Sequence, residues 1–118
     1  MKEWKITLAQ LAPTLMEVRK NAGRALEVMY ESARRGSGLI VLPELYLSGY
    51  AVSGFIRSEA EKRALRADVA EGLSMLREGG KKSKTDILVS YPLFEDGTEK
   101  PYIALEYIAG GETLALHR

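Results

Sequence analysis

The sequence predicts an α/β domain that opens with a strand, a helix and a second strand. Residues 4–11, WKITLAQL, alternate in the way of a strand with two different faces. An amphipathic helical pattern follows, and residues 39–42 then form an aliphatic run without alternation, which is typical of a strand covered on both faces. A chain of 118 residues can build one core, so we expect residues 1–118 to form a single domain.

The charge balance and the absence of cysteine exclude several classes of function. The 17 Lys and Arg residues nearly balance the 16 Asp and Glu residues, so no global field attracts nucleic acid or an anionic membrane, and we expect neither as a partner. The longest apolar run, residues 39–43, is too short to cross a bilayer and no signal segment opens the chain, so we expect a cytoplasmic protein. These residues contain no disulfide, no thiolate metal site and no cysteine nucleophile.

The first helix is predicted from a capping pattern and an apolar stripe. Thr14 and Glu17 have the spacing of a capping box, so we expect the helix to begin at Thr14. Gly36 supplies a left-handed exit from the helix. The apolar positions recur at helical spacing and predict one face packed on a sheet: Val18, Ala22, Ala25, Leu26, Met29 and Ala33.

A second helix is predicted from Ser58 to about Lys84, with Ser58 and Glu61 as another capping box. Gly72 and the pair at 79–80 weaken this helix, because glycine costs about 1 kcal/mol relative to alanine inside a helix. We therefore expect a break in it, or two separate helices.

The last third of the chain is predicted to be β structure. Residues 86–92, DILVSYP, form a further buried strand. Residues 101–108 and 112–117 form two strands joined across the Ala-Gly-Gly of residues 109–111, which is a hairpin pattern. No linker or repeat interrupts this order, so nothing predicts a second domain.

Glu44 is the candidate functional residue of this pattern. It follows the second strand, and in α/β domains ligands gather outside the carboxyl ends of parallel strands. Pro43 stiffens the chain before it, and Gly49 permits a turn that brings Tyr50 back over the site. We expect neighbouring apolar side chains to keep water away, which would raise the proton affinity of the carboxyl and make it a usable base: Leu42, Leu45, Tyr46 and Tyr50.

These residues carry a resemblance to a known family. The stretch GSGLIVLPELYLSGY at residues 36–50, preceded by KITLAQLAP and by a helix that carries Asn21, resembles the opening of a carbon-nitrogen hydrolase of the nitrilase superfamily. The likeness covers the whole chain in order, and the turn at residues 110–112 is similar to the family's turn before its lysine. It implies a four-layer αββα sandwich, of which this chain would form the amino-terminal part.

The resemblance also implies a function. Such proteins hydrolyse nitriles, amides or carbamoyl groups through a glutamate, lysine and cysteine set, without metal or cofactor. Glu44 would be the general base, which takes the proton of the thiol and later activates water, and the substrate would be a small amide or nitrile. Tyr50 is a candidate substrate contact, although we expect Tyr46 and Tyr50 to be packing residues first.

This chain departs from the family pattern in several positions. In the family a lysine follows the segment that corresponds to residues 115–118, and a cysteine nucleophile lies beyond it; neither residue is present in this chain. Leu93 stands where many relatives carry a second glutamate, and Ile103 where they commonly carry asparagine. We therefore expect the chain to be inactive alone. A part of the sandwich would leave an apolar face and an unpaired strand edge in water, so we also expect a homo-oligomer or a complementary fragment as partner.

Other interpretations stay open beside this one. Without the family pattern, Glu44 is more simply a loop charge or a capping residue, and the alternative function is a catalytically silent α/β module for oligomerisation or binding. His117 is expected at an exposed strand end, because no nucleophile motif accompanies it. The lysine-rich residues 81–84 favour a solvated turn over a phosphate site, and residues 10–14 lack the glycine-rich turn of a nucleotide-binding domain.

Overall fold

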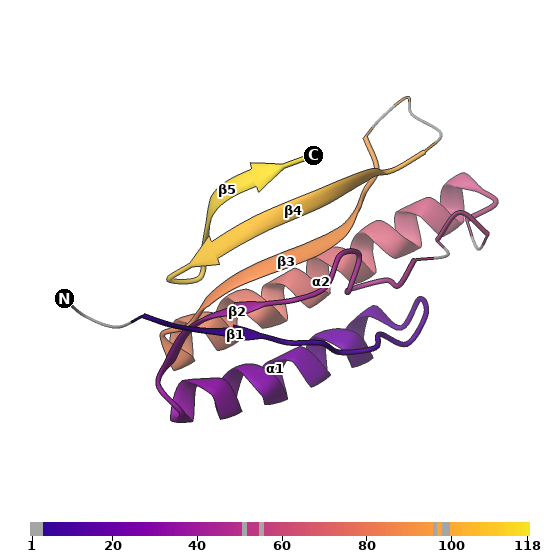
Figure 1. The fold of residues 1–118 in the computed structure, drawn as a ribbon. Helices are drawn as coiled ribbons and strands as arrows, with labels where there is room; N and C mark the ends of the chain where they lie inside the picture. Colours follow the sequence, from indigo (N-terminus) through magenta and orange to yellow (C-terminus); the bar gives the residue numbers. More distant parts are fainter. Residues whose placement is uncertain (1–3, 51, 55, 96, 98–99) are drawn as a thin grey trace.

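A five-stranded sheet with both helices on one face forms the protein (Figure 1). The computed structural model describes residues 4–50, 52–54, 56–95, 97 and 100–118. The elements in chain order are β1 Lys5–Leu8, α1 Val18–Arg34, β2 Ser37–Val41, the short 3-10 helix η1 Val52–Gly54, α2 Glu59–Ser83, β3 Asp86–Leu93, β4 Tyr102–Ala109 and β5 Glu112–His117. The predicted α/β class is therefore confirmed.

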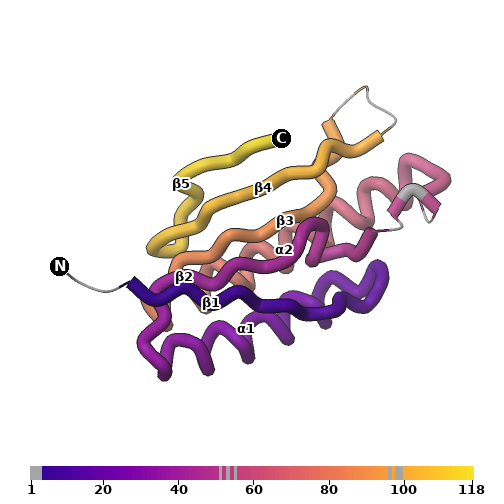
Figure 2. The backbone as a smooth tube through the Cα atoms, in the orientation of Figure 1, coloured from indigo at the N-terminus to yellow at the C-terminus, as the bar shows by residue number. Residues whose placement is uncertain are grey.

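The sheet follows the chain order β1-β2-β3-β4-β5, with β1 and β5 at opposite edges (Figure 2). The strands β1, β2 and β3 are parallel, whereas β3, β4 and β5 are antiparallel. The predicted strand-helix-strand opening and the closing hairpin are both present. Gly110 and Gly111 make the hairpin turn with φ values of 61° and 81°, which glycine adopts at little cost.

The predicted start of α1 is wrong. The helix begins at Val18 with Glu17 as its N-cap residue, and no side chain caps it. Residues 14–17 instead form a turn, in which Met16 has a φ of 64° and donates its backbone N–H to the carbonyl of Ser48 at 2.7 Å. This contact with a distant loop holds the chain in a conformation that a helix cannot contain. The predicted exit is confirmed, since Gly36 has a φ of 84°.

The predicted break in α2 is also wrong, because Glu59–Ser83 is one helix of 25 residues. Its glycines lie where the helix touches its neighbours. A Cβ on Gly72 would come within 2.9 Å of Val18 Cγ1 of α1, and one on Gly80 within 2.9 Å of the Thr85 carbonyl oxygen. The close approach of these elements offsets the low helix propensity of glycine. The Ser58 cap is confirmed, since its Oγ accepts the Glu61 N–H at 3.1 Å.

The hydrophobic core lies between the helices and the sheet, and the opposite sheet face is open in the described residues. Both sides of the sheet carry apolar side chains. Ile6, Leu8, Ile103 and Leu105 are exposed on the open face, where the strand register places them beside Leu39, Val41, Pro92 and Ser90. The predicted apolar face is thus present, and among the described residues β1 and β5 each pair on one side alone, which gives the predicted unpaired edge. The largest fully buried core side chains include Tyr46, Met29, Ile40, Leu47, Leu76, Ile87 and Ile108.

Within the part of the chain that the structure describes, neither helix has the length and apolar character needed to cross a membrane.

Candidate active site

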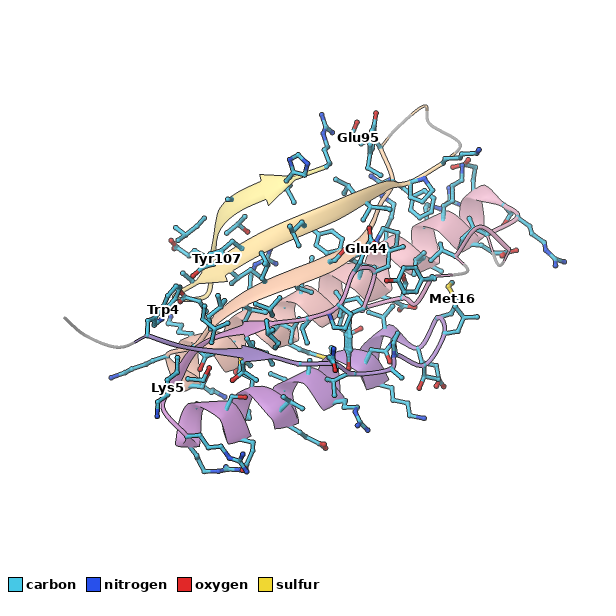
Figure 3. The ribbon with its side chains drawn as sticks, in the orientation of Figure 1. Trp4, Lys5, Met16, Glu44, Glu95 and Tyr107 are labelled. Carbon is cyan, nitrogen blue, oxygen red and sulfur yellow. The ribbon has the colours of Figure 1, made fainter. Side chains whose placement is uncertain are left out.

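Glu44 lies at the carboxyl end of β2, at the end of the sheet opposite to Trp4 and Tyr107 (Figure 3). It borders a hollow of about 400 Å³ on the open face. Because β2 lies between β1 and β3, this carboxylate sits near the middle of the parallel part of the sheet. The predicted position at a strand end is therefore observed. The hollow is lined by Glu44, Ser90, Ile103, Leu105, His117 and Arg118.

The expectation that apolar neighbours keep water from Glu44 is wrong for this chain. Glu44 is exposed. Leu42, Leu45 and Tyr46 are buried, but none of them lines the hollow that Glu44 borders. Tyr50 is 65% exposed and does not line the hollow. The physical reason is that the open face carries no second layer among the described residues, so nothing covers the carboxylate.

The turn after Glu44 is fixed by β3. Leu45 has a φ of 53°, and its N–H donates to the Ser90 hydroxyl oxygen at 2.9 Å. The Leu47 N–H donates to the Ser90 carbonyl at 3.4 Å. Within the turn, the Leu45 carbonyl accepts from the N–H groups of Ser48 and Gly49. The backbone that carries Glu44 is therefore tied to a central strand.

Asn21 on α1 ties the same turn to the loop after β1. Its side-chain oxygen accepts the Thr14 N–H at 2.8 Å, and its amide group donates to the carbonyls of Thr14 and Leu47 at 2.8 and 3.0 Å. The Tyr46 hydroxyl donates to the Asn21 carbonyl at 2.9 Å, and burial raises the pKa of that hydroxyl. Asn21 is itself buried, and this polar residue within the apolar stripe of α1 was the available sequence signal.

Tyr46 and Tyr50 have different surroundings. Tyr46 is fully buried, which confirms the packing role predicted for it. Tyr50 follows Gly49, whose φ of 82° makes the predicted turn. That turn leaves the Tyr50 side chain exposed, so the packing role predicted for it is wrong, and Tyr50 does not line the hollow that Glu44 borders. The structure therefore does not bring Tyr50 and Glu44 together at the hollow.

His117 and Arg118 approach the hollow from the end of β5. His117 is exposed, as predicted, and it pairs with Leu105, the β4 residue that pairs with Ser90. A row across three strands thus places an imidazole on the face that also carries Glu44. Sequence reasoning missed this arrangement, because strand register joins these residues over long separations. Arg118 forms an ion pair with Glu95 and lies 5.3 Å from the centroid of the Tyr102 ring.

A second cluster of charge lies on the helix side of the sheet, away from the hollow. The buried Glu106 carboxylate accepts hydrogen bonds from the Tyr91 hydroxyl, the Thr113 hydroxyl and Arg77, each at 2.6 Å. Burial, together with the Glu106 carboxylate, raises the pKa of Tyr91. These hydrogen bonds join Glu106 of β4 to α2, β3 and β5, so we interpret this cluster as structural. Among the described residues, no group of three His, Asp or Glu side chains could hold a metal ion.

Comparison with known proteins identifies the family. A family model described as carbon-nitrogen hydrolase matches residues 5–118. The chain belongs to the carbon-nitrogen hydrolase family. The resemblance read from residues 36–50 is thereby confirmed. Family membership does not by itself establish a Glu-Lys-Cys set here, since these 118 residues contain no cysteine.

Two curated relatives of this carbon-nitrogen hydrolase chain are glutamine-dependent NAD(+) synthetases. The protein from Thermotoga maritima is 33% identical over 118 residues, which are 100% of this chain and 19% of that protein. The protein from Rhodobacter capsulatus is 30% identical over 101 residues, which are 80% of this chain and 18% of that protein. The chain thus spans about a fifth of the length of these relatives.

Solved structures of the same superfamily share the fold. A cysteine-to-alanine mutant of an amidase from Nesterenkonia AN1, described as a member of the nitrilase superfamily, superimposes with a TM-score of 0.81 and 25% identity, over 98% of this chain and 42% of that chain. The complex of this amidase with butyramide gives the same TM-score and identity. The sheet and two helices therefore have the arrangement found in these nitrilase-fold proteins.

Proposed function

We propose that this chain supplies the general base, Glu44, of a hydrolase that cleaves the carbon-nitrogen bond of a small carboxamide. The observation that carries this is the place of Glu44, on a fixed turn at the carboxyl end of β2 and at the rim of a hollow. Family membership supplies the reaction class. A carboxylate that borders a hollow can reach the proton of a bound reactant.

The proposed chemistry needs groups that this chain lacks. A cysteine thiol would attack the amide carbon while Glu44 takes its proton; ammonia would then leave with that proton, and a thioester would remain. Glu44 would next take a proton from water as the water attacks the thioester, which releases the acid and the thiol. The nucleophile and a donor for the developing oxyanion must come from outside these 118 residues.

The relatives suggest the substrate class. The synthetases are glutamine-dependent. Glutamine carries a side-chain carboxamide, and hydrolysis of its carbon-nitrogen bond releases ammonia. The amidase neighbour binds butyramide, another primary carboxamide. Two aliphatic side chains, Ile103 and Leu105, line the hollow and suit an alkyl stem. We therefore propose glutamine as the first substrate to try, ahead of simple aliphatic amides and nitriles.

Ammonia release by the full-length product of the reading frame tests this function. We expect release from glutamine or a small aliphatic amide, and none from the 118-residue chain alone. The matched control is Glu59→Gln, which removes an exposed carboxylate at the start of α2 and should leave turnover unchanged. A folded full-length protein that releases no ammonia from any amide or nitrile tried would contradict the proposal.

The exposed apolar face supports the second candidate, a silent module that pairs with itself or another subunit. Under this proposal the chain forms a stable oligomer and the full-length protein shows no hydrolysis. Light scattering combined with the ammonia assay separates the two functions. A monodisperse monomer that keeps turnover in the full-length form would rule out the silent module.

A further inference from the structure

Leu45, directly after Glu44, has a backbone conformation that a leucine rarely adopts. Its φ of 53° lies in the left-handed region, which costs a residue with a Cβ about 1–2 kcal/mol and normally favours glycine. Such conformations persist only where the surrounding structure holds them, and they gather at functional sites. A neighbouring group must therefore keep the Leu45 backbone in this left-handed conformation.

Ser90 is the residue that holds it. The Ser90 hydroxyl oxygen accepts the Leu45 N–H at 2.9 Å, and its carbonyl accepts the Leu47 N–H at 3.4 Å. Ser90 lies inside β3, between the two strands β2 and β4, and is 2% exposed. A buried group on a central strand moves little, so it gives the turn a rigid reference point. In the run ILVSYP at residues 87–92, Ser90 and Tyr91 are the two residues with a hydroxyl group, and the other four are apolar.

We propose that Ser90 is a positioning residue for Glu44. Its hydroxyl keeps Leu45 left-handed, and this fixes the direction in which the Glu44 side chain enters the hollow that both residues line. If Leu45 relaxed to an ordinary helical φ, the chain before it would turn by roughly 115° relative to the chain after it. Glu44 would then no longer face the hollow in the same way. The proposal has two parts. The structural part, that Ser90 keeps Leu45 left-handed, stands by itself, whereas the catalytic part, that this positions Glu44 for turnover, rests on the proposed function.

The structural part is tested by NMR on the 118-residue chain. A left-handed residue gives a strong NOE between its own amide and Hα protons, and a bonded amide exchanges slowly. In Ser90→Ala we expect Leu45 to lose this NOE and its amide to exchange about tenfold faster, the effect of one lost hydrogen bond. Ser90→Thr keeps the oxygen and should keep both signals. Ser48→Ala is the control, because among the described residues the Ser48 hydroxyl donates within the turn, to the Gly49 carbonyl.

Two results would overturn the structural part. One is a Ser90→Ala chain in which Leu45 keeps its NOE and its slow exchange. The other result comes from the unsubstituted chain and applies if Ser90→Ala fails to fold. There, a Leu45 amide that exchanges as fast as an exposed loop amide would show that the hydrogen bond to Ser90 is not formed. Slow exchange there, together with retention of the NOE in Ser90→Thr, supports it.

The catalytic part is tested in the full-length protein. Ser90→Ala should lower kcat about 100-fold with little change in KM, because a misplaced base affects the chemical step more than binding. Ser90→Thr should restore most of kcat. Absence of turnover in the unchanged protein would contradict the proposed function itself. Full turnover in Ser90→Ala would instead contradict only the positioning role.

Discussion

The Tyr91 hydroxyl on β3 donates a 2.6 Å hydrogen bond to the carboxylate of Glu106 on β4, and both side chains are buried. Arg77 of α2 meets the same carboxylate at 2.6 Å. This joins the second helix to the antiparallel half of the sheet beneath the open face. A charge buried in this way is tolerated only because its partners neutralise it and satisfy its oxygens.

Replacement of Glu106 should therefore destabilise the protein strongly. In Glu106→Ala the guanidinium of Arg77 and the hydroxyl of Tyr91 lose their acceptor, and we expect the free energy of unfolding in urea to fall by about 3 kcal/mol. Glu71→Ala is the control, since its ion pair with Arg19 is exposed and should contribute at most about 1 kcal/mol. Equal effects of the two substitutions would contradict a structural role for the Glu106 cluster.

The stability of the protein should fall at alkaline pH because of Tyr107. Its hydroxyl donates to the Asp86 carboxylate at 2.6 Å, and this hydrogen bond, with burial and the nearby charge, raises the pKa of Tyr107 to about 12. Below the pKa of about 10 of an unfolded tyrosine the contribution is fully present. As the pH rises from there through about 12, the unfolded chain loses this proton first, so stability decreases.

Spectrophotometric titration of tyrosinate checks this pH dependence. Tyr107→Phe should remove a component that titrates near pH 12. Asp86→Asn should move the same component toward the ordinary pKa of tyrosine, because the carboxylate that holds the proton is gone. If Asp86→Asn leaves the titration unchanged, the hydrogen bond is not the cause of the shift.

Two glycine-to-alanine substitutions should have opposite effects. A Cβ at Gly23 of α1 would meet nothing within 4 Å, so Gly23→Ala should raise the free energy of unfolding by about 0.5–1 kcal/mol through helix propensity and lower unfolded-state entropy. At Gly80 the Cβ would lie 2.9 Å from the Thr85 carbonyl oxygen, so Gly80→Ala should lower it by about 1–3 kcal/mol. Thermal unfolding measures both, and stabilisation by Gly80→Ala would show that α2 and β3 do not approach this closely.

Asn21 should stabilise both loops at the Glu44 end of the sheet. In Asn21→Ala the backbone groups of Thr14 and Leu47 lose their partners, and we expect a loss of about 2–3 kcal/mol in urea unfolding. Asn21→Asp should be no better, because a carboxylate cannot donate to the two carbonyls. Lys20→Ala, at the adjacent exposed position, serves as control. An Asn21→Ala chain as stable as this control would show that the hydrogen bonds contribute no net stability.

Local patterns in the sequence predicted most of the fold, because the responsible interactions are local. The strand-helix-strand opening follows from apolar periodicity, and the closing hairpin follows from Gly110 and Gly111. The two errors have tertiary causes. A hydrogen bond from Met16 to Ser48 delays the start of α1, and the packing of α2 on its neighbours makes Gly80 compatible with an unbroken helix.

The candidate site was predictable only in part for the same reason. Glu44 could be placed at a strand end, since that depends on the order of elements. The hydrogen bond from Leu45 of this turn to Ser90 spans 45 residues, and the contact of Asn21 with Leu47 spans 26 residues. The exposure of Glu44 depends on whether a second layer covers the open face. The local sequence of residues 36–50 does not determine this.

The effect of Glu44→Gln on amide turnover by the full-length protein shows whether Glu44 is the general base. Glutamine keeps the size and polarity of the side chain but cannot accept a proton from a thiol, so kcat should fall at least about 100-fold while thermal stability and circular dichroism stay the same. Glu59→Gln, the control, should keep full activity. A well-folded Glu44→Gln protein that hydrolyses amide at the unchanged rate would contradict the assignment of Glu44 as the general base.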